Sequence, residues 1–171
     1  MIETERLILR PQLEADFEAL CTMWADPDVV RFVGGVASTP EQTWSRLVRS
    51  VGMWSMRGFG QFAVLDKLDG RLLGDVGLAD YHRGLGERFD PYPEAGWVIA
   101  SQAHGKGYAT EAVAAAHRWF DQNRPETRSV CIISPDNAAS LRVAERVGYR
   151  PFGRADYRGE VIMLERIQPA L

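Results

Sequence analysis

A glycine-containing turn between an apolar segment and an amphipathic segment constrains this chain more than any other feature. Residues 94–100 are almost wholly apolar, which predicts a central β-strand. Gly105 and Gly107 follow, and apolar residues recur at helical spacing across residues 105–123. The first turn of a helix has four backbone N–H groups without helical partners, and glycine lets a bulky anion approach them closely. The pattern therefore predicts a strand–turn–helix unit that binds phosphate.

The rest of the chain alternates between strand and helix patterns. We predict strands over residues 6–10, 61–67, 71–79, 129–133, 149–153 and 161–167, and helices over residues 14–25, 39–56 and 137–147. The order is β-α-α-β-β-β-α-β-α-β-β, which favours an α/β domain with a mixed sheet. A length of 171 residues fits a single domain over residues 1–171.

Composition narrows the classes of function. The 20 Lys and Arg residues and 23 Asp and Glu residues give a net charge of −3, which disfavours binding to nucleic acid or to an anionic membrane. No apolar run approaches the roughly 20 residues of a membrane span, and the first ten residues are charged, so we expect a cytoplasmic protein. The 2 Cys and 3 His residues lack metal-ligand spacing, so we expect no metal site, no disulfide, and buried thiols at Cys21 and Cys131.

Three phosphate-binding motifs compete for the glycine-containing turn. The Walker pattern G-x-x-x-x-G-K-[ST] is absent. The dinucleotide pattern G-x-G-x-x-G would begin at Gly105, but its third glycine is replaced by Thr110. The pattern Q-x-x-G-x-G is filled by Gln102, Gly105 and Gly107. The third motif therefore fits best, and a dinucleotide-binding domain stays as a weaker alternative.

A second block supports the third motif. Residues 134–149 contain Asn137 and Ser140 in an Asn-x-x-Ser helix start, followed by Gly148-Tyr149. With residues 3–11, 54–60 and 74–77, these blocks resemble the GNAT superfamily of N-acetyltransferases, and within it the RimJ/RimL branch, over nearly the whole chain. The resemblance implies the GNAT fold, a central mixed, mostly antiparallel sheet of six to seven strands flanked by about four helices.

The resemblance also implies an activity. It is the transfer of an acetyl group from acetyl-CoA, a cosubstrate, to a primary amine of a protein N-terminus or a small molecule. Direct attack within a ternary complex requires neither a nucleophilic cysteine nor a metal. A homodimer is compatible with the family. The alternative from another class is a catalytically silent acyl-CoA-binding module of the same fold.

The family motifs assign the cosubstrate site residue by residue. The turn would hold the pyrophosphate, the strand would lie beside the acetyl-pantetheine arm, and the N–H of Val98 would polarise the thioester carbonyl. Asn137 would contact the arm, and Ser140 would lie near the sulfur. The expected cofactor-binding set is Trp97, Val98, Ile99, Gln102, His104, Gly105, Lys106, Gly107, Tyr108, Ala109, Thr110, Asn137 and Ser140.

Catalysis needs a base for the ammonium and an acid for the leaving thiolate. We expect Glu94, at the start of the strand, to act as the base directly or through water, with His82 or water alone as alternatives. Many relatives carry a tyrosine acid where this chain has Ala144, which leaves Ser140 or water as the acid.

Overall fold

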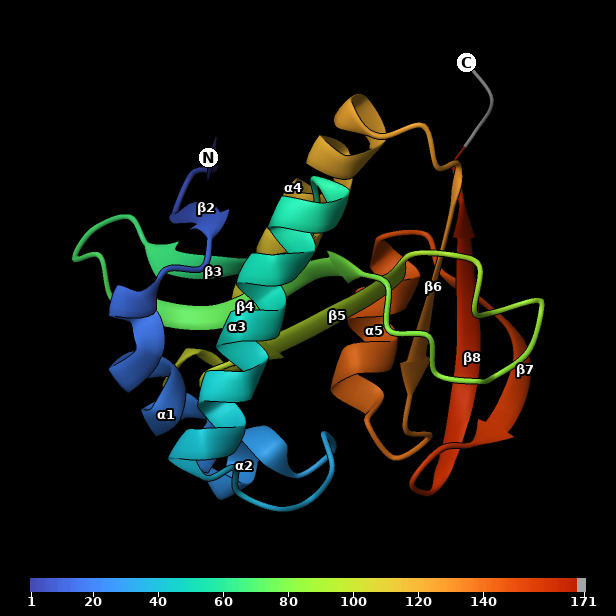
Figure 1. Cartoon of the computed structure of the whole chain (residues 1–171), viewed down its shortest axis with the longest axis horizontal. Helices are drawn as coiled ribbons and strands as arrows, with labels where there is room; N and C mark the ends of the chain where they lie inside the picture. Colours follow the sequence, from blue (N-terminus) through green and yellow to red (C-terminus); the bar gives the residue numbers. More distant parts are fainter. Residues whose placement is uncertain (169–171) are drawn as a thin grey trace.

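The computed structural model describes residues 1–168, in which eight strands form one sheet (Figure 1). Their spatial order is β1-β2-β3-β4-β5-β6-β8-β7, and only β5 and β6 run parallel. The strands are β1 (Ile2–Glu3), β2 (Leu7–Pro11), β3 (Gln61–Asp66), β4 (Leu72–Ala79), β5 (Glu94–Ile99), β6 (Arg128–Ile133), β7 (Arg150–Asp156) and β8 (Glu160–Ile167). The predicted α/β class with a mixed sheet is confirmed, and β1 adds a strand. The last three residues of the predicted domain, 169–171, lie outside the described part.

Five α-helices flank the sheet within residues 1–168. They are α1 (Phe17–Ala25), α2 (Pro27–Val30), α3 (Pro40–Arg57), α4 (Tyr108–Asn123) and α5 (Ala138–Arg146), with short 3-10 helices at Glu14–Asp16 and Ser101–Ala103. The start of α3 is set by a capping box in which Thr39 and Gln42 bind each other's backbone N–H. The short α2 was not predicted. Between residues 1 and 168, no helix is both long and apolar enough to cross a membrane.

Apolar side chains on both faces of the sheet form the core. On one face, side chains of α1, α2 and α3 pack against β3 and β4, as the cluster of Leu20, Trp24, Leu47 and Ala63 shows. On the other face, α4 and α5 pack against the central and C-terminal strands. Strands β3 and β4 are thus covered on both faces, whereas β7 is largely exposed. An open site in the covered part of the sheet therefore needs an edge or an interruption.

The interruption lies between β5 and β6. Their only register pair is Glu94 with Val130, and the Val130 N–H donates to the carbonyl of Pro93 at 3.0 Å. Beyond that pair the two strands diverge (Figure 1). The divergence opens the middle of the sheet along β5.

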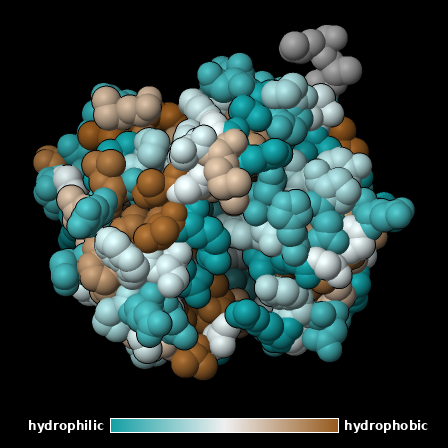
Figure 2. Space-filling model, viewed as in Figure 1, coloured by the Kyte–Doolittle hydropathy of each residue, from teal (hydrophilic) through white to brown (hydrophobic). Residues whose placement is uncertain are grey.

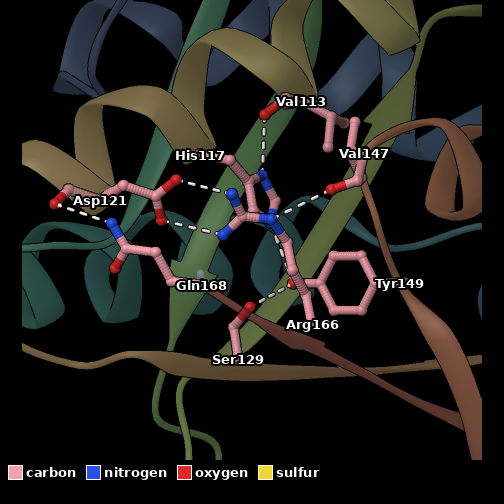
Figure 3. Close-up of polar contacts among 8 residues, drawn as sticks. All are labelled: Val113, His117, Asp121, Ser129, Val147, Tyr149, Arg166 and Gln168. Atoms are coloured by element: carbon pink, nitrogen blue, oxygen red, sulfur yellow. Dashed lines mark hydrogen bonds and ion pairs between the residues drawn. The ribbon is translucent and has the colours of Figure 1, made fainter. Parts of the chain in front are cut away.

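A buried polar network joins the elements on the C-terminal side of this opening (Figure 3). His117 of α4 contacts the carbonyl of Val113 through Nδ1 at 2.8 Å and the hydroxyl of Tyr149 through Nε2 at 2.9 Å. Because a carbonyl only accepts, Nδ1 carries the proton and Tyr149 donates to Nε2. The Ser129 hydroxyl lies 2.7 Å from the Tyr149 hydroxyl. The network fixes α4 against β6 and the start of β7.

Two sequence-based predictions need correction. Helix α4 begins at Tyr108 instead of residue 105, because Gly105 and Gly107 have φ values of +73° and +81°, in the left-handed region. Cys21 is half-buried, whereas Cys131 is buried as expected.

Candidate active site

An open cleft of about 1740 Å³ begins where β5 and β6 diverge. Its walls come from the segment between α2 and α3, from α3, β4, β5 and β6, from the start of α5, and from the β7–β8 turn. In Figure 2 the surface is hollowed near its centre, with largely hydrophilic residues to the right of the hollow. Five predicted site residues line this cleft: Glu94, Trp97, Val98, Asn137 and Ser140.

The hydrogen-bonding pattern between β4 and β5 determines which backbone N–H groups of β5 point toward the opening. Ala100 N–H donates to the Leu73 carbonyl at 2.8 Å, and these residues continue the β4–β5 register, in which Val98 pairs with Asp75. Antiparallel ladders alternate, so Val98 directs its N–H toward β4, and Trp97 and Ile99 direct theirs toward the diverging side. This corrects the prediction for the Val98 amide, although its side chain does line the cleft.

Ser140 meets β5 across the opening. The indole Nε1 of Trp97 donates to the Ser140 hydroxyl oxygen at 3.2 Å. An indole N–H is a donor only, so this contact uses Ser140 as an acceptor and leaves the serine proton free for another acceptor. The geometry therefore suits Ser140 to proton donation.

Asn137 is the N-cap residue of α5. Its Oδ1 accepts the backbone N–H of Ser140 at 3.1 Å, which fixes the first turn of the helix. The side-chain NH₂ of Asn137 is the group left to donate to a ligand in the cleft.

Glu94 is buried in an ion pair rather than solvated. Arg83 contacts both of its carboxylate oxygens, through Nε at 2.5 Å and Nη2 at 2.7 Å. Arg83 Nη1 also donates to the hydroxyl of Tyr157 at 2.8 Å, and its guanidinium lies 4.6 Å from the Tyr81 ring centroid. Burial raises the pKa of Glu94, and Arg83 opposes that shift. Each oxygen keeps a second lone pair for a proton or a water.

The glycine-containing turn lies outside the cleft, at the start of α4. A Cβ at Gly105 would meet nothing within 4 Å, and one at Gly107 would meet only Arg6, at 3.5 Å. An exposed turn with open space above two left-handed glycines leads directly into the N-terminus of a helix, which is the arrangement that favours an anion.

Side chains around the turn hold it in place. His104 Nε2 lies 2.7 Å from the Ile99 carbonyl, and Lys106 Nζ donates to the Gln102 carbonyl at 2.9 Å. Arg6 Nη1 donates to the Lys106 carbonyl at 2.9 Å. The imidazole of His104 thus ties the turn to the end of β5. Tyr108, Ala109 and Thr110 form the first turn of α4 and are half-buried.

Comparison with known proteins gives this geometry a context. The sequence profile of the GNAT acetyltransferase domain matches residues 6–150. The chain belongs to the GNAT acetyltransferase family. It is thus an enzyme of the acetyltransferase class, and its fold is the GNAT fold.

Three relatives each match most of the length of this chain. A Bordetella pertussis structure assigned to the GNAT acetyltransferases is 35% identical, with a TM-score of 0.88 over 96% of this chain and 98% of that one. The uncharacterised protein YkkB of Bacillus subtilis is 28% identical over 85% of this chain and 82% of its own. AAC(6')-Ib, solved with paromomycin and acetyl-CoA, shares the fold at 19% identity, with a TM-score of 0.78 over 95% of this chain and 94% of that one.

The GNAT cleft also contains residues that sequence reasoning missed. Asp75 of β4 lines it, and its Oδ1 is buried without a hydrogen-bond partner among residues 1–168. Burial raises the pKa of Asp75 to about 6. Arg46 of α3 also lines the cleft, with a buried and unpartnered Nε. The alternation of β4 could have placed Asp75 on one face, but the sequence gives no sign that α3 leaves this face open.

His82 does not lie in the cleft. It is exposed in the segment between β4 and β5, at a φ of +49°, whereas its neighbours Tyr81 and Arg83 line the cleft. This placement argues against His82 as the base. Within residues 1–168, no group of three or more His, Cys, Asp or Glu residues has a metal-binding arrangement.

Proposed function

We propose that this enzyme transfers the acetyl group of acetyl-CoA directly to a primary amine bound in the cleft, and that it belongs to the RimJ/RimL-like branch. The contact between Trp97 and Ser140 carries the proposal, because it orients a hydroxyl proton donor at the point where β5 and β6 diverge. The acetyl-CoA in the AAC(6')-Ib structure, which has the same fold, supports the choice of cosubstrate.

The residues present fit acetyl-CoA. The turn of Gly105 and Gly107 would receive the pyrophosphate at the N-terminus of α4, with Gln102, Lys106 and Thr110 around it. The amides of Trp97 and Ile99 would face the arm along the open side of β5 and bind the carbonyl oxygen as it gains charge. The NH₂ group of Asn137 would donate to an amide oxygen of the arm.

The chemistry divides between two side chains. The neutral amine attacks the thioester carbon, the carbon–nitrogen bond forms, and the carbon–sulfur bond then breaks. Ser140 donates its proton to the departing sulfur and regains one, through water, from the protonated nitrogen of the tetrahedral intermediate. Glu94 receives the proton of the amine, through a water molecule because Arg83 covers both carboxylate oxygens.

Two measurements on one preparation test the proposal. Acetyl-CoA at about 100 times its dissociation constant is expected to stabilise the protein by roughly 2.7 kcal/mol, whereas NAD is expected to have no effect. Release of free CoA is then followed with simple amines, N-terminal peptides and aminoglycosides. Stabilisation without CoA release for any amine would favour a silent acyl-CoA-binding module, and an unchanged melting temperature would reject acetyl-CoA as the ligand.

A further inference from the structure

Several arginines line the cleft without a carboxylate at ion-pair distance. Within residues 1–168, no ion pair involves the cleft arginines Arg31, Arg46, Arg49 and Arg158. Arg46 and Arg49 lie three residues apart on α3, so they share one side of that helix. Their charges are therefore available to a molecule in the cleft.

Arg46 is the most constrained of these residues. Its guanidinium lies 4.1 Å from the centroid of the Trp24 ring, and its Nε is buried without a hydrogen-bond partner. Burial lowers the pKa of Arg46, and the nearby charge of Arg49 lowers it further. An unpaired buried donor on a cation costs stability, so a partner from outside the chain would gain most here.

The acidic residues of the cleft do not cancel this charge. Glu94 is bound by Arg83, and Glu160 forms an ion pair with Arg154. Asp136 and Glu41 are exposed. The remaining carboxylate is Asp75, which interacts with both Arg46 and Arg49. One carboxylate thus faces two guanidinium groups, which leaves a local excess of positive charge at Arg46 and Arg49.

We propose that the acceptor amine also carries an oxyanion, a carboxylate or a phosphate, and that Arg46 and Arg49 bind it. This inference rests on the proposed function, because the same cleft contains Ser140 and Glu94. The planar guanidinium fork matches the geometry of both oxyanions. A polycationic acceptor would instead meet like charge in this cleft.

Binding to the CoA-loaded protein tests the inference without turnover. Calorimetry compares the twenty common amino acids with their C-terminal amides, and O-phosphoethanolamine with ethanolamine. Binding is the better readout because an amino-acid amide loses its ammonium proton more readily, which biases a rate toward the neutral compound. We expect at least one charged compound to bind about tenfold to a hundredfold more tightly than its neutral counterpart.

Three variants locate the preference. Arg49→Gln, at an exposed position, and Arg46→Gln are expected to abolish the preference for the charged compound. Arg118→Gln, an exposed arginine of α4 outside the cleft, is expected to keep it. Arg49→Gln remains informative if Arg46→Gln fails to fold.

The outcomes separate the two proposals. If no charged compound binds better than its neutral counterpart, or if Arg49→Gln retains the full preference, the inference is overturned. Efficient acetylation of neutral amines or aminoglycosides alone would overturn it and leave the proposed function intact. The carboxylate and phosphate pairs identify which oxyanion is recognised.

Discussion

The buried polar side chains around His117 are all hydrogen-bonded, whereas several buried polar atoms around Asp75 have no hydrogen-bond partner. In the first region Arg166 binds both carboxylate oxygens of Asp121 at 2.9 and 2.6 Å and donates to the Val147 carbonyl at 3.0 Å, beside the contacts of His117 and Tyr149 (Figure 3). Among the side chains that line the cleft, buried atoms of Asp75, Arg46 and Gln61 lack hydrogen-bond partners within residues 1–168.

The difference separates stability from ligand binding. A buried network whose hydrogen bonds are all made stabilises the contacts between elements. A buried polar atom without a partner lowers the stability of the folded state, because its desolvation is not compensated. The region around His117 joins α4 to β6 and β8, so its contacts are completed within the chain. The unpaired atoms belong to side chains that line the cleft, so a ligand bound there is expected to complete them.

Both regions contain a group whose pKa is shifted by burial, and the two shifts have opposite consequences. Burial lowers the pKa of His117 to about 4 and raises that of Asp75 to about 6. The folded state binds fewer protons than the unfolded state at His117 between pH 4 and 6.5, so that residue makes stability fall on acidification. Asp75 binds more protons in the folded state between pH 3.8 and 6, so it makes stability fall as pH rises.

The largest expected effect is the loss of the pH dependence due to His117. Between pH 6.5 and 4, the shift corresponds to about 3 kcal/mol of unfolding free energy. We expect His117→Gln to flatten the stability curve by about this amount relative to the wild type, whatever its absolute stability. Denaturant unfolding at half-unit pH steps measures the difference. Parallel curves for the two proteins would show that His117 titrates normally.

The second effect is on catalysis. Ser140→Ala is expected to lower the turnover number on the order of a hundredfold, because a hydroxyl aimed at the sulfur acts mainly as charge develops there. Acetyl-CoA affinity is expected to change little. The α5 cap persists because Asn137 binds the backbone N–H of Ser140 and not its hydroxyl.

Steady-state rates and melting temperatures on one preparation measure both effects of Ser140→Ala. Ser140→Thr, which retains a hydroxyl, is the matched control and is expected to recover part of the turnover. A fully active Ser140→Ala would remove this residue from the mechanism and leave water as the acid.

The third effect is on stability alone. Tyr149→Phe removes the hydroxyl between His117 and Ser129 and leaves two buried polar atoms without that partner. We expect a loss of about 2 kcal/mol in unfolding free energy and an unchanged rate, because the network lies outside the cleft. Thermal and denaturant unfolding measure the loss. A large fall in turnover at temperatures where the variant stays folded would show that the two regions are coupled.

The sequence predicted the elements well where local patterns determine them. The spacing of apolar residues located α3 and α4, and Asp69-Gly70 located the β3–β4 hairpin. The start of α4 was misplaced because apolar periodicity does not reveal left-handed glycines such as Gly105. The short β1 has only two residues and exists because it pairs with β2. A two-residue strand has too few residues to show a recognisable sequence pattern.

The candidate site was predicted only in part because its contacts join distant residues. Glu94 was recognised, but its partner Arg83 lies 11 positions away in an irregular segment. The contact between Trp97 and Ser140 spans 43 positions. The direction of the Val98 amide depends on the register with β4, which a single sequence does not specify.

The smallest expected effect is at Asp75, and it has the opposite sign to the effect at Tyr149. Because burial raises the pKa of Asp75 to about 6, the charged carboxylate is disfavoured in the folded state at pH 8. Replacing it with the neutral Asn removes that cost, whereas the interaction of the carboxylate with Gln12 and the attraction of Arg46 and Arg49 are also lost. We therefore expect Asp75→Asn to raise the unfolding free energy at pH 8 by about 1 kcal/mol or less, after screening by solvent in the open cleft.

The pH profile makes this small change measurable. At pH 4, where the native Asp75 is protonated, Asp75→Asn and the wild type are expected to converge, and the gain is expected to appear as the pH rises through 6. Asp136→Asn is the control, because Asp136 is an exposed aspartate of the same cleft. A loss of stability in Asp75→Asn at pH 8 would mean that Arg46 and Arg49 already hold this carboxylate as a structural ion pair. The cleft would then resemble the region around His117, and fewer of its charges would be available to an acceptor.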